Sequence, residues 1–162
     1  MVEGSHVKSQ TNGSMRWASN YTSWKAKKMA KESGLGMALA IDDSGGSART
    51  ISNDITNFDF AIPRAVQDVT GLDKSGMERL LLLADFSIGV TGVFNDASNM
   101  SHDVFKTVSS TSVARTVTIT VSGQSLPNAT FFTDYALSRG AGGELTFTAP
   151  GVLTGGTVPT WA

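Results

Sequence analysis

Residues 112–122 read SVARTVTITVS and alternate between two kinds of side chain along most of their length. One parity carries the apolar residues and the other the hydroxyl residues: Val113, Val117, Ile119 and Val121 against Thr116, Thr118, Thr120 and Ser122. Such alternation predicts a β-strand with one buried face. The polar face is built from threonine, whereas a solvated strand face more often carries Lys and Glu. We therefore expect protein to cover this polar face.

Similar stretches recur along the chain and are separated by turn-forming residues. Alternating or short apolar runs predict further strands at residues 37–41, 48–51, 56–62, 86–94, 131–137 and 144–149. The first two flank the segment DDSGG at residues 42–46, which predicts a β-hairpin. Gly89 and Gly92 predict a bulge or a close backbone contact within their strand. Short strands joined by turns in this way predict an antiparallel sheet.

Residues 95–112 contain the best helix candidate, at about residues 99–109. Ser98 or Ser101 is the expected N-cap, because a serine hydroxyl accepts a hydrogen bond from the first free amides of a helix. The apolar stripe consists of Val104, Phe105 and Val108. The sequence therefore predicts a mainly β fold: an antiparallel β-sandwich or barrel-like domain with one flanking α-helix.

Residues 64–85 give conflicting signals. The segment Ser75–Glu78 matches a capping box, and the run Met77–Ala84 that overlaps it has helical propensity. An apolar run of this length also fits a strand buried on both faces. Between the two alternatives, the capping box favours a short helical turn.

Composition limits the class of protein. A chain of 162 residues with 40% apolar and 17% charged residues is globular and long enough for one domain. It has no cysteine, which excludes disulfides, cysteine-ligated zinc, iron–sulfur clusters and thiol nucleophiles. No apolar run approaches the roughly 20 residues that a membrane-spanning helix requires. We therefore expect a single domain with no membrane association.

The first 28 residues differ from the rest. They contain five Lys or Arg and one Glu, whereas residues 29–162 contain eight basic and thirteen acidic side chains. Trp17, Tyr21 and Trp24 at helical spacing would suit a helix on a membrane surface. The favoured interpretation is a leader that is non-native or disordered, with Met29 as the true start of a domain at 29–162. The acidic domain argues against a surface that grips nucleic acid.

Catalytic motifs are missing from the sequence. The histidines are His6 and His102, and neighbours on one helix do not face each other, so Ser101, His102 and Asp103 do not form a triad. Phosphate-binding glycine motifs and zinc-protease or hydrolase motifs do not occur. Asp54 and Asp59 fit the solvent face of a strand. We therefore expect no enzyme activity and no catalytic, cofactor-binding or metal-binding residue.

Several segments follow one another in a distinctive order. They are ISNDIT at 51–56, PRAVQDVTGL at 63–72, GVFN at 92–95, SHDVF at 101–105, TDYALSR at 133–139, LTFTAPG at 145–151 and PTW at 159–161. Together they resemble the major tail tube protein of long-tailed, non-contractile (siphovirus-type) bacteriophages. The similarity covers residues 29–162.

The resemblance implies a structural virion protein. Its fold would be a β-sandwich whose copies form hexameric rings around a β-lined channel, and the rings would stack into a tube. The implied partners are other copies of the chain, a tape-measure protein and tail terminator or initiator proteins. Viral DNA would pass through the tube without specific binding. The implied location is the virion tail, and the host cytoplasm during assembly.

The resemblance also implies where copies meet. The region 63–83 is similar to a long loop or hairpin that reaches a neighbouring subunit or ring. Candidate contacts between subunits or rings are Gln67, Asp68, Val69, Thr70, Leu72, Thr116, Thr118, Thr120 and Trp161. The alternative function is a monomeric β-sandwich binding or adhesin-like module of a phage particle that binds a carbohydrate or a receptor. Such a module requires an exposed aromatic platform, for which Tyr135 and Trp161 are the candidates.

Overall fold

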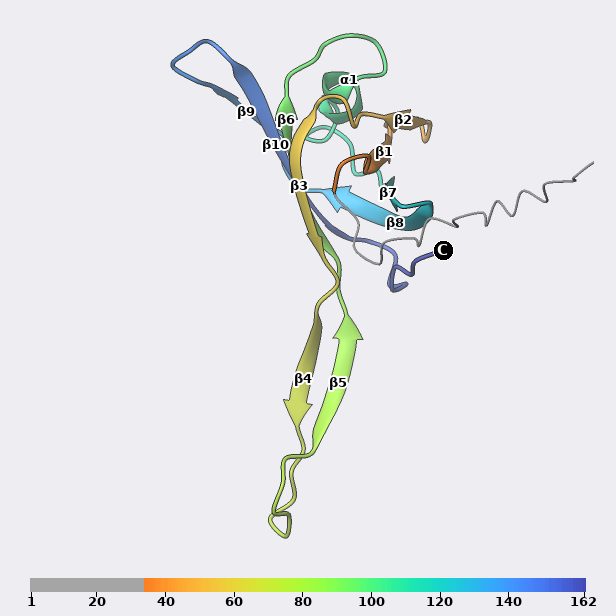
Figure 1. Cartoon of the computed structure of the whole chain (residues 1–162), viewed down its shortest axis with the longest axis vertical. Coiled ribbons are helices and arrows are strands. Elements are labelled where there is room, and N and C mark those ends of the chain that lie inside the picture. Colours follow the sequence, from red (N-terminus) through yellow and green to blue (C-terminus); the bar gives the residue numbers. More distant parts are fainter. Residues whose placement is uncertain (1–33) are drawn as a thin grey trace, which may run out of the picture. The chain divides into compact units, whose positions relative to one another are not determined.

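The computed structural model describes residues 34–162, which form ten strands and one helix (Figure 1). The interpretation of residues 1–28 as a leader lies outside these described residues. The helix α1 is Ser101–Phe105. The strands are β1 (Ala38–Asp42), β2 (Ala48–Thr50), β3 (Ile55–Ala61), β4 (Arg64–Asp68), β5 (Arg79–Ala84), β6 (Ser87–Val93), β7 (Arg115–Val121), β8 (Gln124–Phe132), β9 (Ala136–Arg139) and β10 (Leu145–Leu153).

Eight strands form one antiparallel sheet in the order β2-β1-β7-β8-β10-β6-β3, with β9 pairing with β10. The remaining strands, β4 and β5, form a separate antiparallel pair. Inward side chains from both halves of the large sheet and from α1 meet in a single core cluster. The expected mainly β, antiparallel fold with one flanking helix is therefore confirmed.

Strand β7 shows the alternation expected from its sequence. Val117 and Ile119 are fully buried, and each contributes about 1.5–3 kcal/mol through removal of its side chain from water. Thr116 on the opposite face is exposed. Val113 differs from the prediction, because it precedes the strand and is 39% exposed. The inward position nearest to it in β7 is occupied by Arg115.

Arg115 is the largest fully buried side chain among the described residues. Its guanidinium donates hydrogen bonds to the carbonyls of Asp42 (3.2 Å) and Val104 (2.8 Å) and to the Thr107 hydroxyl (2.8 Å). Burial lowers the pKa of Arg115, while the negative charge of Asp43 acts in the opposite direction. These bonds connect β1, α1 and the segment after the helix, so a charged residue fixes the position of α1 on the sheet.

Helix α1 is shorter than predicted and is capped differently. It spans five residues, Met100 is the N-cap without a side-chain hydrogen bond, and neither Ser98 nor Ser101 caps it. Instead, the Ser101 amide donates to the carboxylate of Asp54, which precedes β3, at 2.9 Å. The N-cap prediction was wrong because the acceptor comes from a segment distant in sequence.

The C-terminal strands also differ from the expected boundaries. The segment 131–137 does not form one strand, because β8 ends at Phe132 and β9 begins at Ala136. Strand β10 continues past Ala149, and along one edge it exchanges partner β9 for partner β8. Pro150 lies between the residues that pair with β9 and those that pair with β8. A proline, which has no N–H to donate, is tolerated at such a position. The Pro150 carbonyl accepts from the Thr133 amide at 2.9 Å.

Gly92 confirms the predicted close backbone contact. A Cβ at this position would overlap the carbonyl of Asp54 and the ring of Phe147. The β3–β6 register also shifts between Ile55 and Asn57, opposite Gly92 and Thr91. A bulge and a residue without a side chain therefore occur together where β3 approaches the core.

The short helical turn expected at residues 77–84 was wrong. Residues 79–84 form β5, which pairs with β4 through Val66 opposite Leu81, Gln67 opposite Leu80 and Asp68 opposite Arg79. Cross-strand pairing overrides the weak helical propensity of the leucine run. The alternative of a strand buried on both faces is also incorrect, because Leu80–Leu83 are all exposed.

Candidate interaction surface

The β4–β5 hairpin projects from the body of the sheet as an extension of β3 and β6 (Figure 1). Ala61 and Ser87 face each other as the last pair between β3 and β6. At the base of the hairpin, the Asp85 amide donates to the Pro63 carbonyl at 2.9 Å. All five residues of β4 and the first five of β5 are exposed. The hairpin thus receives little support from the body of its own molecule.

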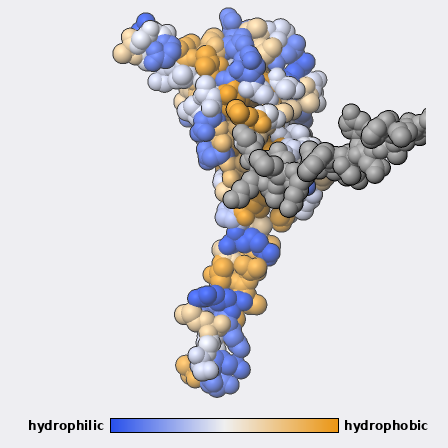
Figure 2. All heavy atoms as spheres, in the orientation of Figure 1, coloured by the Kyte–Doolittle hydropathy of each residue, from blue (hydrophilic) through white to orange (hydrophobic). Residues whose placement is uncertain are grey.

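The stalk of this hairpin, here defined as Val66 and Leu80–Leu83, is apolar on both faces. Val66 and Leu81 face each other on one side and are 53% and 61% exposed. Strand alternation places Leu80 and Leu82 on the other side, and they are 55% and 42% exposed. Figure 2 shows hydrophobic atoms along the hairpin between hydrophilic bands. Burial of both faces requires protein on both sides of the ribbon.

The tip of the hairpin is polar and held by its own hydrogen bonds. The Thr70 hydroxyl donates to the Asp68 carboxylate and accepts from the Glu78 amide at 2.9 Å. The Thr70 side chain, followed by its amide, lowers the pKa of Asp68. Lys74 lies 3.8 Å from the Glu78 carboxylate. The tip is therefore held by hydrogen bonds within the chain.

The five hairpin residues proposed from the sequence occupy this strand and tip. Gln67 and Asp68 end β4, whereas Val69, Thr70 and Leu72 follow it. Leu72 is fully exposed and Val69 is 42% exposed. The sequence did not single out the leucines of β5, although four consecutive leucines without alternation were the available signal.

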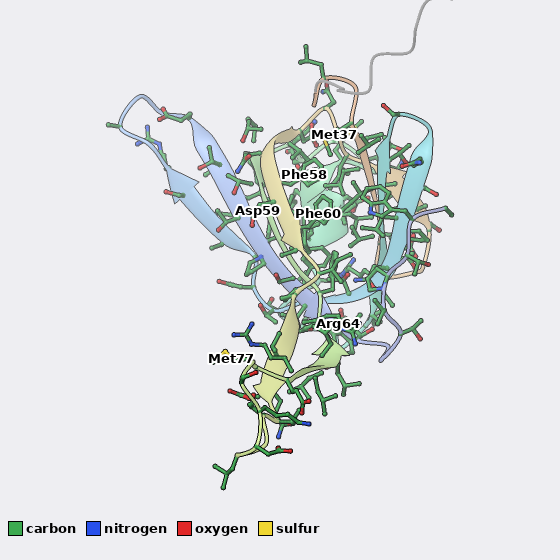
Figure 3. All side chains as sticks on the ribbon, turned by 60° about the horizontal axis from the view of Figure 1, so that its bottom comes forward. Met37, Phe58, Asp59, Phe60, Arg64 and Met77 are labelled. Atoms are coloured by element: carbon green, nitrogen blue, oxygen red, sulfur yellow. The ribbon has the colours of Figure 1, made fainter. Side chains whose placement is uncertain are left out.

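A second surface lies on the outward side of β3, β6, β10 and β9. The register places Asn57, Thr91, Thr148 and Ala136 in one row across the four strands. On one side the next row of this face is Asp59, Gly89 and Pro150, followed by Ala61, Ser87 and Val152; on the other side the next row is Val93, Thr146 and Ser138. Asp59 adds a carboxylate opposite Gly89, and Figure 3 shows it on the other side of β3 from Phe58 and Phe60. This surface, called the four-strand face below, consists mainly of small and hydroxyl side chains and carries little charge.

The threonines of β7 lie on a similar outward surface. Thr116 is exposed, whereas Thr118 and Thr120 are half-buried. Thr118 lies between Ala40 and Pro127, and Thr120 lies beside Ser125. The sequence pattern identified this surface but missed the four-strand face, whose hydroxyl residues come from four separated segments.

The C-terminal segment lies along β8. The Thr154 amide donates to the Ala129 carbonyl at 3.1 Å, and Ala162 and Ser125 exchange two backbone hydrogen bonds of 2.9 Å. Trp161 is 45% exposed, and its ring contacts the Phe60 ring edge-on at a centroid distance of 6.2 Å. Part of Trp161 is thus used within the molecule, and part is available to a partner.

A groove of about 270 Å³ lies between β8 and the segment that precedes β7. Its lining is Val108, Thr111, Ser112, Val113, Phe131 and Phe132. Phe131 is 40% exposed, and its strand partner Val152 is 42% exposed. The groove and Val152 therefore form an exposed apolar area that contains no charged side chain.

The histidine and the two aspartates considered as catalytic candidates, His102, Asp54 and Asp59, differ in their contacts and burial. His102 lies with its ring centroid 4.7 Å from that of Phe94 and its Nδ1 3.2 Å from the Tyr135 hydroxyl. Burial raises the pKa of Tyr135. Asp59 is exposed as expected, but Asp54 is only 5% exposed and accepts from Asn95 at 2.9 Å as well as from α1. The solvent-face interpretation of Asp54 was therefore wrong.

Metal and membrane features were sought over residues 34–162. No group of three or more His, Asp or Glu side chains in this range is arranged to hold a metal ion. The one helix in this range is too short to cross a membrane.

Comparison with known proteins links this fold to particle tails. No family model and no curated protein sequence matches the chain. Among solved structures, a chain in the virion of a native gene transfer agent particle matches with a TM-score of 0.67 and 17% identity, over 82% of this chain and 99% of that chain. A chain in the tail of an empty gene transfer agent particle with C6 symmetry matches with the same score and identity, over 82% and 98%. The protein thus has the antiparallel β fold found in these particles, and the likeness to tail proteins inferred from its sequence holds at the level of fold.

Proposed function

We propose that the protein is a structural subunit of a virion tail: a tail tube protein whose copies form hexameric rings that stack into a conduit for DNA. The observation that carries this proposal is the exposed apolar stalk of the β4–β5 hairpin, on a fold shared with chains of a C6-symmetric tail. The proposed site of action is the virion tail, after assembly in the host cytoplasm.

The hairpin supports assembly because it is unfavourable in an isolated molecule. A two-stranded ribbon is marginally stable in water without further packing. Leu80–Leu83 are 42–92% exposed, so burial by neighbouring copies would contribute on the order of 5 kcal/mol, at 1.5–3 kcal/mol for each fully buried leucine. Exposed apolar surface of this kind marks a contact with protein.

The outward faces of the sheet suit a tube subunit that contacts neighbouring copies and lines a channel for DNA. The four-strand face carries Asp59 among hydroxyl and small side chains, and the threonine face of β7 is similar. Uncharged faces pack against protein without burying an unpaired charge. The charge of −5 for residues 29–162 would give −30 in a ring of six, which repels DNA phosphates and reduces binding to the wall.

Further partners follow from the proposed role. A tape-measure protein would occupy the tube during assembly, and terminator and initiator proteins would bind its ends. In this proposal DNA passes through the tube without specific binding, and the protein does not bind a membrane. The role is structural and requires no catalytic residue.

The alternative of a monomeric binding module has less support. Such a module requires aromatic side chains that together form an exposed platform. Tyr135 is half-buried and stacks on Phe105 at 5.6 Å between ring centroids, whereas Trp161 contacts Phe60. The two candidate aromatic residues thus serve different packing contacts.

Electron microscopy of the purified protein tests the proposal. At high concentration the protein should form rings or tubes with a central bore, and Leu81→Glu should remain monomeric because a carboxylate would enter an apolar contact. Ser44→Glu, in the exposed β1–β2 turn, adds the same charge away from the hairpin and should assemble normally. A parent protein that stays monomeric up to millimolar concentration, also with tail components added, would refute the proposed function.

A further inference from the structure

The proposed function leaves open which surface receives the hairpin. The apolar stalk needs a counterpart that is concave and apolar and that lacks charged groups to desolvate. The groove beside β8 is lined by no charged side chain, and four of its six lining residues are apolar: Val108, Val113, Phe131 and Phe132. Leucine can enter such a groove without leaving a charged group unpaired.

Two larger hollows in the described residues have different linings. One, of about 330 Å³, is lined by Pro127, Ala129, Val158 and Pro159 together with polar residues that include the amide residue Asn128. The other, of about 470 Å³, includes Ser52, Thr56 and Asn57 in its lining. Both hollows also have apolar lining residues, but each includes an asparagine, Asn57 or Asn128, whereas the groove has none. An apolar side chain that covers an amide removes it from water at a cost, so the groove suits the stalk better.

One face of the stalk matches the groove better than the other. Val66 and Leu81 lie opposite each other and form a continuous apolar pair. On the same face, the next pair is Asp68 opposite Arg79, whose charges are of opposite sign. The other face pairs Leu80 with the amide side chain of Gln67. The face of Val66 and Leu81 therefore has an apolar cross-strand pair where the other face has an amide.

The contact must join two molecules. In the structure, Leu81 and Val66 remain exposed, and the hairpin runs away from the body that carries the groove (Figure 1). Phe131 and Val113 in the groove are also exposed, at 40% and 39%. Neither surface is covered by its counterpart in the same chain.

We propose that the groove of one copy receives Val66 and Leu81 of a second copy. This inference rests on the proposed function and names the receiving surface within it. Stalk and groove are different surfaces, so each copy donates one hairpin and accepts another. Such a head-to-tail contact generates a closed ring or a continuing stack.

Complementation between two defective variants tests the pairing. Leu81→Glu removes the donor and keeps the groove, whereas Phe131→Glu removes the groove and keeps the donor. Each variant alone should be monomeric by analytical ultracentrifugation, with self-association weakened at least about 100-fold, which corresponds to about 2.7 kcal/mol. An equimolar mixture should form dimers that do not grow, because each dimer contains one intact contact. Assembly of either variant alone, or a mixture that stays monomeric, would overturn the pairing.

Engineered cysteines give a second measurement that does not depend on a charged substitution. The chain has no cysteine, so Leu81→Cys combined with Val113→Cys provides the thiols for a specific disulfide. Oxidation of assembled protein should give a ladder of covalent oligomers from the double variant. Either single variant, and the control pair Leu81→Cys with Thr50→Cys, should give no ladder.

The results separate this inference from the proposed function. If the parent forms tubes but neither complementation nor the cysteine ladder occurs, the receiving surface lies elsewhere and the inference is refuted. If Phe131→Glu does not fold, the cysteine pair decides between the outcomes. If the parent forms no rings or tubes up to millimolar concentration, also with tail components added, the proposed function itself fails.

Discussion

Replacement of Asp54 by alanine should destabilise the protein more than replacement of any exposed carboxylate. Asp54 is 5% exposed, and its carboxylate accepts from the Ser101 amide and the Asn95 side chain, both at 2.9 Å. Alanine would leave the buried Ser101 amide and the half-buried Asn95 side chain without this acceptor. The first turn of α1 would also lose the group that replaces a serine cap.

The expected magnitude follows from these two bonds. A hydrogen bond to a charged group contributes about 1.5–3 kcal/mol, and the two bonds share one carboxylate, so the loss should be about 3–5 kcal/mol. A domain of this size is stable by about 5–15 kcal/mol. Asp54→Ala should therefore remain folded only marginally, with a large decrease in the urea concentration at the unfolding midpoint.

Urea unfolding followed by far-ultraviolet circular dichroism measures the effect. Asp59→Ala is the matched control, because Asp59 is an exposed carboxylate on the adjoining strand and should change stability by less than about 0.5 kcal/mol. Asp54→Asn should lie between the two, since it keeps one acceptor oxygen and presents an N–H group to the other donor. A difference below about 1 kcal/mol between Asp54→Ala and Asp59→Ala would refute the capping role of Asp54.

Other predictions concern the sheet, its outward face and acid stability. Gly92→Ala should cost about 3 kcal/mol or prevent folding, because its methyl group meets a backbone carbonyl and an aromatic ring, whereas Gly89→Ala should be milder in the same urea titration. Thr118→Lys should unfold like the parent but form fewer tubes by electron microscopy, and equal tube formation would contradict an assembly role for this face. The Asp43 carboxylate accepts from backbone amides and Arg49, which lowers its pKa below 3.8, so its stabilising effect is present above pH 3.8 and is lost as pH falls towards the lower value. A titration by nuclear magnetic resonance should show this pKa rising in Arg49→Gln, though not to its ordinary value, because the backbone bonds remain.

The body of the fold could be predicted from the sequence because its residues are buried by their own chain. Val117 and Ile119 alternate with threonines, and this period-two pattern led directly to β7. The turn segment at 42–46 likewise predicted the β1–β2 hairpin. In these segments the local pattern and the tertiary structure agree.

Buried polar groups were harder to predict because their partners are distant in sequence. Asp54 and Asp59 are the same residue type on one short segment, yet the first is enclosed by α1 and the second is exposed. Arg115 stands at an inward position of β7, where its acceptors come from Asp42, Val104 and Thr107. Composition and spacing contain no information about such long-range acceptors, which are specified only by the folded structure.

The hairpin was mispredicted for a different physical reason. Pattern analysis assumes that a run of leucines is buried by the chain that carries it, so Leu80–Leu83 suggested either a core strand or a helix. The structure places them on a ribbon where pairing with β4 satisfies the backbone while the side chains stay exposed. The expectation that region 63–83 reaches a neighbour came instead from the family resemblance.

The contrast between body and hairpin bears on how assembly is controlled. The body has a closed core and satisfied buried polar side chains, so it can fold before it meets another copy. The hairpin has a tip held by its own hydrogen bonds, but its apolar stalk is exposed and unsupported by the body. Folding and assembly are therefore separable steps: substitutions in the core should change both, whereas substitutions in the stalk should change assembly alone. Growth of the proposed tube would then be governed by the concentration of folded copies, not by slow folding of each subunit at the tube end.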